Sequence, residues 1–321
     1  MLLEVTKLSK AKTSNGLVQK LGPLFGLLLI VVIISIMSPS FLTADNIFNV
    51  LRQVSISALI AFGMTFVILT GGIDLSVGST LALTGAVAAT LLAGGYDPFI
   101  AMAAALALGL VLGAVNGIII AKGKVAPFIA TLATMTIYRG LTLVYTDGKP
   151  VSGLGEHLSF QMFGKGYLFG IPVPIVTMAV AFFVLYFILR KTTFGRRVYA
   201  IGGNAEASRL SGINVDRTTI AVYALTGMLA AMSALILTSR LNSAQPTAGT
   251  SYELDAIAAV VLGGTSLTGG RGWIVGTLIG ALIIGVLNNG LNLIGVSSFF
   301  QQVVKGIVIL FAVLIDRKKA A

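Results

Sequence analysis

Residues 98–121 read PFIAMAAALALGLVLGAVNGIIIA, a run without a single charged side chain. A helix needs about 20 apolar residues to cross the hydrocarbon core of a bilayer, so this run predicts a transmembrane helix. The rest of the chain has the same character, because 56% of its 321 residues are apolar and only 10% are charged. A soluble domain has about 25% charged residues. The composition therefore excludes a water-soluble domain and predicts one membrane domain.

Applying the same criterion along the chain predicts an all-α, polytopic membrane protein of about ten transmembrane helices. Turn-forming residues separate several of the runs, as at Ser38-Pro39-Ser40 and at Asp147-Gly148-Lys149-Pro150. The run 254–269 is short and rich in glycine. The candidate spans are 21–38, 47–70, 75–94, 98–121, 126–146, 172–190, 218–240, 254–269, 273–294 and 298–315.

Basic residues orient these spans. With the amino terminus inside and an even number of spans, the inner segments receive Lys7, Lys10, Lys12, Lys20, Lys122, Lys124, Arg190, Lys191, Arg196, Arg197, Arg209, Arg217, Arg271, Arg317, Lys318 and Lys319. By the positive-inside rule, both termini are cytoplasmic. The net charge of +11 thus reflects membrane orientation and not nucleic-acid binding. We expect cytoplasmic tails at 1–20 and 316–321, a transmembrane domain at 21–315, and one long cytoplasmic loop at 191–217.

A weak internal similarity suggests a repeat. Gly113-Ala114-Val115-Asn116-Gly117 resembles Val286-Leu287-Asn288-Asn289-Gly290, and each precedes a turn and another span. In the predicted topology, spans two to five and seven to ten have opposite orientations. An inverted repeat of these two groups is a recurrent plan of transporters.

The long inner loop contains a predicted short helix. Asn204 is a favourable N-cap, Glu206 lies in the first turn, and Gly212 suits the end of the helix. So short a helix is marginal alone in water and needs a surface to pack on. Two interpretations remain open: a docking element for a cytosolic partner, or a solvated basic loop beside anionic lipid headgroups.

Four separated motifs resemble the permeases of bacterial ABC importers for monosaccharides, over nearly all of the chain after about residue 40. They are Leu69-Thr70-Gly71-Gly72-Ile73-Asp74-Leu75-Ser76-Val77-Gly78-Ser79, the loop run from Gly202 to Ile213, Ser243-Ala244-Gln245-Pro246-Thr247-Ala248-Gly249-Thr250, and the run from Tyr252 to Leu267. Among members of that family, the stretch from Gln245 to Leu267 looks most like the ribose permeases.

The resemblance implies a set of partners in the bacterial inner membrane. These are a second copy of the chain, two ATP-hydrolysing subunits or a fused pair of them, and a periplasmic sugar-binding protein, besides the lipid bilayer. It also implies that the short loop helix couples the permease to the ATPase. The residues concerned are Asn204, Ala205, Glu206, Ala207, Ser208, Arg209, Leu210, Ser211 and Gly212.

The chain itself has no motif for nucleotide binding or catalysis. No Gly-x-x-x-x-Gly-Lys-Ser/Thr run occurs, so any ATP is expected to bind a partner subunit. The sequence has no cysteine, and His157 is its one histidine, so we expect no metal site and no cofactor. An intramembrane enzyme has little support, because no Ser/His/Asp set or paired carboxylates share a span.

Several polar residues in or near the spans are candidates for a pathway. Side-chain amides can hydrogen-bond sugar hydroxyls, but they also join helices to one another. The cations have the alternative of extending toward the headgroups. The pathway candidates are Asn288, Asn289, Asn292, Gln301, Gln302, Arg139 and Lys305.

Asp74 follows a glycine pair where a new helix begins, so we expect it to cap backbone N–H groups, with an ion or proton site as the alternative. Lys149, Lys165 and Arg240 lie on or beside outer loops, where they are candidates for docking the periplasmic protein, although solvated charges are the simpler explanation.

The alternative function is an ion-coupled secondary sugar transporter. It requires an ionisable residue buried at mid-membrane, and none of the eleven acidic residues lies clearly there. Ribose is implied by resemblance alone, and permeases for galactose, arabinose or xylose share much of the pattern.

Overall fold

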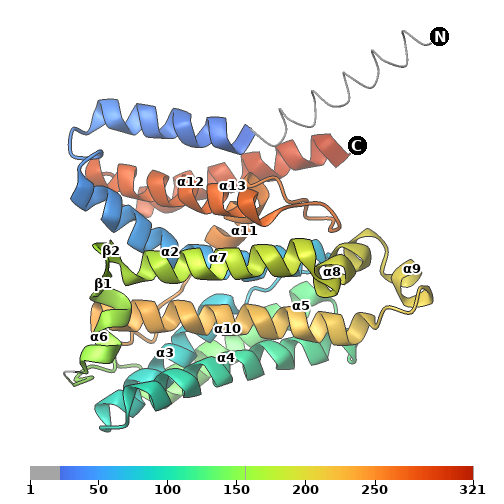
Figure 1. Cartoon of the computed structure of the whole chain (residues 1–321), viewed down its shortest axis with the longest axis horizontal. Helices are drawn as coiled ribbons and strands as arrows, with labels where there is room; N and C mark the ends of the chain where they lie inside the picture. The colour runs from blue at the N-terminus through green and yellow to red at the C-terminus, as the bar shows by residue number, and fades with distance from the viewer. Residues whose placement is uncertain (1–21, 156, 321) are drawn as a thin grey trace.

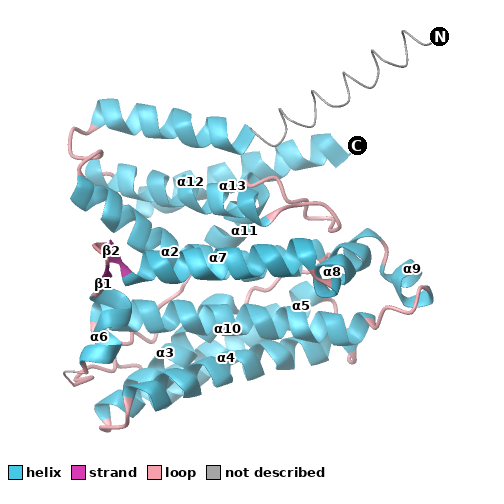
Figure 2. Cartoon of the chain, in the orientation of Figure 1, coloured by secondary structure: helices cyan, strands magenta, loops and turns pink. Residues whose placement is uncertain are grey.

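The computed structural model describes residues 22–155 and 157–320. It is a bundle of helices that run side by side along the long axis of the molecule (Figure 1). One small hairpin, β1 (Tyr167–Leu168) paired with β2 (Ile171–Pro172), interrupts the helices (Figure 2). The predicted tail 1–20 lies outside the described residues, as do Glu156 and Ala321.

The helices follow the predicted runs closely. After the helix Gly22–Met37 come α2 (Ala44–Leu69), α3 (Val77–Ala93), α4 (Pro98–Ala121), α5 (Pro127–Thr146), α6 (Leu158–Lys165), α7 (Val173–Lys191), α8 (Thr193–Gly203), α9 (Ala205–Leu210), α10 (Val215–Leu241), α11 (Tyr252–Leu262), α12 (Ile274–Leu293) and α13 (Ser298–Ala320). In the described part of the chain, α2, α4, α5, α7, α10 and α12 are long and apolar enough to cross a membrane.

The predicted span 254–269 is wrong in its second half. Helix α11 ends at Leu262, and a glycine-rich loop follows it as far as Trp273. Its 11 residues extend about 16 Å, roughly half of the hydrocarbon thickness. Hydropathy predicted a longer helix because a buried loop can be as apolar as a helix. This loop is held by tertiary contacts instead, including a hydrogen bond from Gly270 N to Leu69 O of 2.9 Å.

The core is organised around α2 and α10. Nearly every residue of α2 from Val54 to Leu69 is buried. Helix α4 packs on α10 through Gly109, Gly113 and Gly117, one every four residues. A Cβ atom added at Gly113 would lie 2.1 Å from the carbonyl oxygen of Tyr223. The two backbones are therefore in direct contact, the small-residue packing expected between membrane helices.

An irregular segment, residues 242–251, packs between helices after α10 ends. Gly249, at φ +73°, lies against the backbone of Gly78 in the first turn of α3. Arg139 of α5 donates from Nη1 to the carbonyl oxygens of Pro246 and Ala248, at 2.6 and 2.9 Å. Non-helical backbone among membrane helices needs such protein partners, because lipid offers its polar groups none.

Short elements lie at both ends of the bundle. Helices α8 and α9 project at one end, and α6 with the β1–β2 hairpin lies at the other (Figure 1). Helices α6 and α8 lie in segments that the sequence predicts to be loops, whereas α9 is the predicted loop helix.

Candidate functional site

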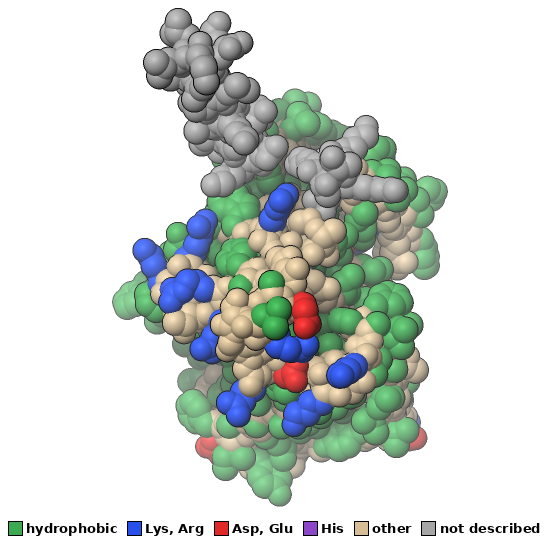
Figure 3. All heavy atoms as spheres, turned by 90° about the vertical axis from the view of Figure 1, so that its right-hand side faces the viewer, with side chains coloured by type: hydrophobic (Ala, Val, Ile, Leu, Met, Phe, Trp, Pro, Cys, Tyr) green, Lys and Arg blue, Asp and Glu red, His purple; other side chains and the backbone are tan. Residues whose placement is uncertain are grey.

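The end of the bundle that carries α9 is strongly basic. Seen end-on, lysine and arginine side chains gather around α9 (Figure 3). They come from the ends of α4 and α7, from α8 and α9, and from the start of α10. The acidic Glu206 and Asp216 also belong to this surface, where Arg209 lies 3.4 Å from a carboxylate oxygen of each. All three side chains are largely exposed, so these ion pairs add little stability.

The predicted capping of α9 is confirmed. The Asn204 side chain accepts a hydrogen bond from the Ala207 N–H at 2.9 Å, and Gly212 adopts φ +82° just after the helix. Ser208 is buried against the bundle, whereas Leu210 is 83% exposed at the tip. An apolar side chain presented to water at the end of a projecting helix is suited to contact another protein.

We expect Asn204→Ala to destabilise α9 by about 1 kcal/mol, because the substitution removes the one side-chain acceptor at its amino end. Hydrogen exchange of the amides of residues 205–210 measures the effect. Asn204→Asp is the matched control, since a carboxylate accepts the same bond and favours the positive helix end. Equal exchange in the wild type and Asn204→Ala would show that packing alone forms the helix.

Gly202 joins the α8–α9 segment to the core. A Cβ atom at this position would lie 1.8 Å from Leu69 O and 2.4 Å from Gly270 N. The end of α8 therefore contacts both the end of α2 and the loop between α11 and α12. Tyr199, one turn earlier, donates its hydroxyl to Gly272 O at 2.8 Å. The end of α8, directly before α9, is thus in backbone contact with both α2 and the α11–α12 loop.

A cavity of about 610 Å³ opens beneath α9. Its wall includes Thr70 and Gly71 from the turn after α2, Lys124 from the α4–α5 connection, Arg209 from α9 and Tyr223 from α10. Polar groups line this cavity at the basic end of the molecule.

Asp74 lies in the turn between α2 and α3 and is 1% exposed. Its carboxylate accepts from the Ser76 N–H at 2.9 Å and from the Ser76 hydroxyl at 2.7 Å. Ser76 is itself the N-cap of α3, so Asp74 closes the turn before the helix. Burial raises the pKa of Asp74 to about 6, against the lowering effect of these two bonds. Among the described residues, no group of three potential metal ligands occurs.

A second polar cavity, of about 430 Å³, lies within the helix bundle between α2, α10, α11, α12 and α13. It brings together four of the predicted pathway residues, Asn288, Asn292, Gln301 and Lys305. Gln301 donates to Asn292 Oδ1 at 2.8 Å. The side-chain oxygen of Asn288 is buried and has no hydrogen-bond partner within the described part of the chain. A free acceptor in a polar cavity is available to a ligand hydroxyl.

One wall of this cavity carries a buried ion pair. Lys305 of α13 lies 2.9 Å from Asp255 in the first turn of α11, and their side chains are 23% and 9% exposed. Asp255 is thus an acidic residue buried among the helices, as is Asp74 in the turn before α3. In the sequence, Asp255 lies at the start of the predicted span 254–269, one residue beyond Leu254.

The other predicted pathway residues lie elsewhere. Asn289 exchanges two hydrogen bonds with Asn46 of α2, at 2.8 and 3.0 Å, and so joins two helices. Gln302 is exposed on α13. Arg139 holds the segment 242–251, as described above, and lines a separate cavity of about 390 Å³ with Glu253.

The three predicted docking cations differ in exposure. Lys149 is exposed and pairs with Asp147 at 2.8 Å, and Lys165 is exposed at the end of α6. Arg240 is half-buried: it donates to Asn49 Oδ1 at 3.0 Å and lines the 430 Å³ cavity. Arg240 therefore belongs to the cavity wall, together with residues that the sequence analysis missed, namely Gln53, Ser57 and Tyr252.

Comparison with known proteins places these features in context. The family model described as "Branched-chain amino acid transport system / permease component" matches residues 46–313. The chain is 66% identical to the ribose import permease protein RbsC of Bacillus subtilis, over 96% of this chain and 95% of that protein. It is 58% identical to the protein of the same name in Escherichia coli strain K12, over 92% of this chain and 93% of the relative.

Similarity extends to a permease for another sugar. The chain is 42% identical to the D-allose transport system permease protein AlsC of Escherichia coli, over 93% of this chain and 91% of that protein. No solved structure matches the chain significantly.

Proposed function

Because the chain belongs to the branched-chain amino acid transport system permease family, we propose that it is the membrane-spanning permease subunit of an ATP-binding-cassette importer for ribose. The relatives are permease components of transport systems, so the chain is a transport subunit and not an enzyme. The observation that carries the proposal is α9, a capped helix that projects from the basic end. The sequence has no P-loop, so ATP binds a partner subunit.

The basic end faces the cytoplasm in this proposal. The positive-inside rule assigns the end with α8 and α9 to the cytoplasmic side of the bacterial inner membrane, and both termini with it. The α9 helix, residues 204–212 with its flanking caps, then docks on two ATP-hydrolysing subunits or a fused pair. A periplasmic sugar-binding protein delivers ribose to the opposite end, where Lys149 and Lys165 are exposed.

The packing of the helices supports ten crossings arranged as an inverted repeat, in which the loop after Leu262 completes the crossing that α11 begins. Pairing α2–α5 with α10–α13 in chain order predicts equivalent contacts in the two halves. Helix α4 packs on α10 as α12 packs on α2, α3 on α4 as α11 on α12, and α3 on α5 as α11 on α13. The short helices α3 and α11 occupy corresponding positions. In transporters built from repeats, interrupted segments at corresponding positions mark the substrate site.

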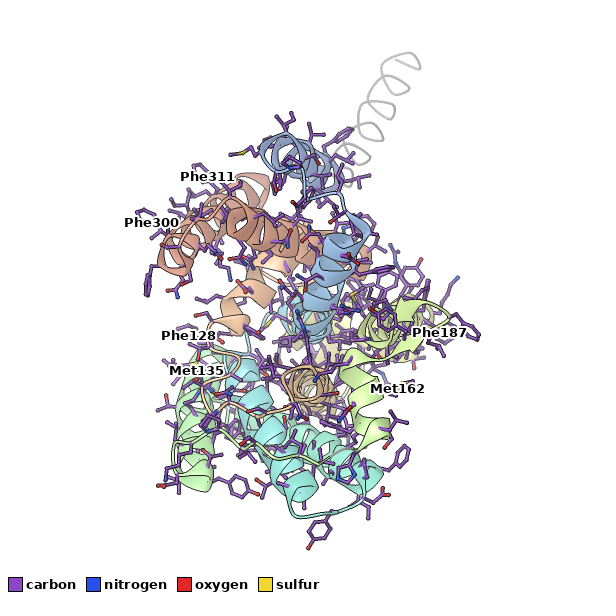
Figure 4. All side chains as sticks on the ribbon, turned by 90° about the vertical axis from the view of Figure 1, so that its left-hand side faces the viewer. Phe128, Met135, Met162, Phe187, Phe300 and Phe311 are labelled. Carbon is purple, nitrogen blue, oxygen red and sulfur yellow. The ribbon has the colours of Figure 1, made fainter. Side chains whose placement is uncertain are left out.

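A homodimer is supported by one flank of the bundle. Phe128 and Met135 of α5 lie on the same side of the molecule as Phe300 and Phe311 of α13, while Met162 and Phe187 lie on the opposite side (Figure 4). The cavity that contains Arg139 and Glu253 adjoins α5 on this flank. The charged Arg139 and Glu253 in a hollow on an apolar membrane face are costly against lipid, and a second copy of the chain covers them in this proposal.

The 430 Å³ cavity is the proposed part of the pathway within one chain. Its amides and hydroxyls offer ribose hydrogen-bond donors and acceptors. Because most of these groups are uncharged, they bind a sugar weakly enough to let it pass. The cavity also adjoins the first turn of α11, one of the two short helices, because Tyr252 and Asp255 line it.

Reconstitution tests the proposal. The chain is placed in vesicles with and without its ATPase subunit, the binding protein and ATP, and uptake of labelled ribose is measured. We expect uptake only when all components are present. ATP-independent uptake by this chain alone, or uptake abolished by dissipating the proton gradient in ATP-fed vesicles, would favour the ion-coupled alternative.

We expect Asn288→Leu to lower ribose uptake about tenfold, because the loss of one or two hydrogen bonds to a passing sugar corresponds to about 1.4 kcal/mol. ATP hydrolysis by the assembled complex is expected to persist, since the cavity that Asn288 lines shares no residue with the cavity beneath α9. Gln302→Leu is the matched control, an exposed amide on α13. Equal losses in both variants would contradict the assignment of the cavity to the pathway.

A further inference from the structure

The β1–β2 hairpin presents an apolar tip at the end of the molecule opposite α9. The register pairs Tyr167 with Pro172 and Leu168 with Ile171, which leaves Phe169 and Gly170 as the two turn residues. Both have positive φ, +50° and +78°, as in the turns that close two-residue hairpins. Phe169 is 96% exposed, and the flanking Tyr167, Leu168 and Ile171 are exposed as well.

A phenylalanine at this turn position is unusual. The left-handed region favours glycine and asparagine, and a bulky side chain there is strained. Asparagine would serve the turn better, so local folding does not explain the aromatic ring at Phe169. Its nearly complete exposure also means that it adds nothing to the core. The ring therefore has a role outside the chain.

The hairpin is held firmly in position. Phe160 of α6 is 1% exposed, and the Gly164 N–H donates to Ser239 Oγ of α10 at 2.9 Å. Arg52 of α2 donates to the Tyr167 hydroxyl and lies 5.1 Å from the centre of its ring. The tip is thus a fixed surface and not a loose loop.

Lipid is the occupant that this surface fits. No charged residue occurs from Gly166 to Leu189, a run that includes the hairpin and nearly all of α7. The hairpin leads directly into α7, whose Val180, Phe183 and Phe187 are exposed along the length of the helix. Met162 of α6 and Phe187 lie on the same flank (Figure 4). The apolar surface of α7 therefore continues onto the hairpin.

The polar neighbours match a membrane interface. Tyrosine with arginine is typical of the headgroup level, where an aromatic ring has one apolar and one wet end. A periplasmic protein that binds transiently would leave the four bulky apolar side chains of the hairpin exposed to water whenever it is dissociated. We propose that the hairpin inserts Phe169 into the boundary between headgroups and acyl chains of the outer leaflet. The orientation proposed above determines only which leaflet the hairpin meets, and the insertion itself does not depend on it.

The absence of cysteine from the chain allows a direct test. Phe169→Cys gives each copy of this chain a single thiol, and the nitroxide label placed on it has an apolar ring that takes the place of the phenylalanine. The chain is labelled before it is assembled with its partners and reconstituted in phospholipid vesicles. Collisions of the label with oxygen, which partitions into lipid, are compared with collisions with a water-soluble nickel complex. Val180→Cys on α7 is the lipid control and Lys149→Cys in an exposed loop is the water control.

We expect the label at 169 to resemble that at 180, with several-fold greater access to oxygen relative to nickel than at 149. A label at 169 that matches the one at 149 would overturn the proposal. So would a label whose access to both reagents falls only when the binding protein is added, because that result assigns the tip to a protein partner.

A second variant separates the anchor from the fold. Phe169→Asn gives the turn a residue that tolerates positive φ, so the hairpin is expected to form. With a label at Leu168→Cys, access to nickel is expected to rise several-fold when Phe169→Asn is added. An unchanged ratio at 168 would show that Phe169 does not hold the tip in the membrane. Ribose uptake is not the readout, so failure of the transport assignment is detected separately.

Discussion

Gly202→Ala is expected to abolish ATP-driven ribose uptake and to destabilise the chain by about 3 kcal/mol, an overpacking cost at the upper end of the usual range. The new methyl group would lie 1.8 Å from Leu69 O and 2.4 Å from Gly270 N. Both are backbone atoms, which cannot turn aside as a flexible side chain does. The α8–α9 segment must therefore separate from α2 and the α11–α12 loop, and with it the link between the partner ATPase and the core. Vesicle uptake and thermal unfolding of the purified complex measure the two effects.

The neighbouring glycine is the control. A Cβ atom at Gly203 meets nothing within 4 Å, although Gly203 also lies at the end of α8. We expect Gly203→Ala to retain uptake and stability close to the wild type. If both alanine variants import ribose normally, the contact at Gly202 is not a route of coupling. If both fail, the effect is one of helix propensity or docking and not of the close approach to α2.

Lys305→Met is expected to destabilise the protein by about 3–5 kcal/mol, because it leaves the carboxylate of Asp255 buried without its cation. The pair lies at 2.9 Å, with side-chain exposures of 23% and 9%. The same change replaces one charged residue that lines the proposed pathway, so uptake should also fall. The midpoint of thermal unfolding in detergent or nanodiscs gives the change in stability.

The double variant Asp255→Leu/Lys305→Met is expected to recover much of this loss, since it leaves no unpaired charge. The exposed pair of Lys149 and Asp147 provides a matched comparison at 2.8 Å. Lys149→Met should cost less than about 1 kcal/mol, because water solvates both charges. Equal destabilisation by Lys305→Met and Lys149→Met would mean that the cavity is fully hydrated and the pair at 305 is not buried in the membrane.

Local signals explain what could be predicted from the sequence. The long apolar runs and the α9 helix depend on residues close in sequence: hydrophobicity over about 20 positions in one case, and Asn204 with Gly212 in the other. The short helix α11 could not be predicted in this way. Its end at Leu262 depends on distant backbone, such as the contact of Gly270 with Leu69, which no local window contains.

The same limit applies to the cavity. Asn288 and Asn289 are adjacent on α12, yet their side chains point in different directions because successive residues on a helix are about 100° apart. One lines the cavity and the other pairs with Asn46. The sequence identified both as polar residues in a span, but only the packing of α2, α11 and α13 around α12 decides which one meets the pathway.

The glycine contacts between α4 and α10 have a mechanical consequence. Because the two backbones are in contact, α4 cannot slide along α10. A shift of one residue would bring the side chains next to Gly109 and Gly113 into the main chain of α10. We therefore expect these two helices to move as a single rigid body during transport. Opening and closing are then expected at contacts without this close backbone approach, above all where α13 packs against α11 and α12.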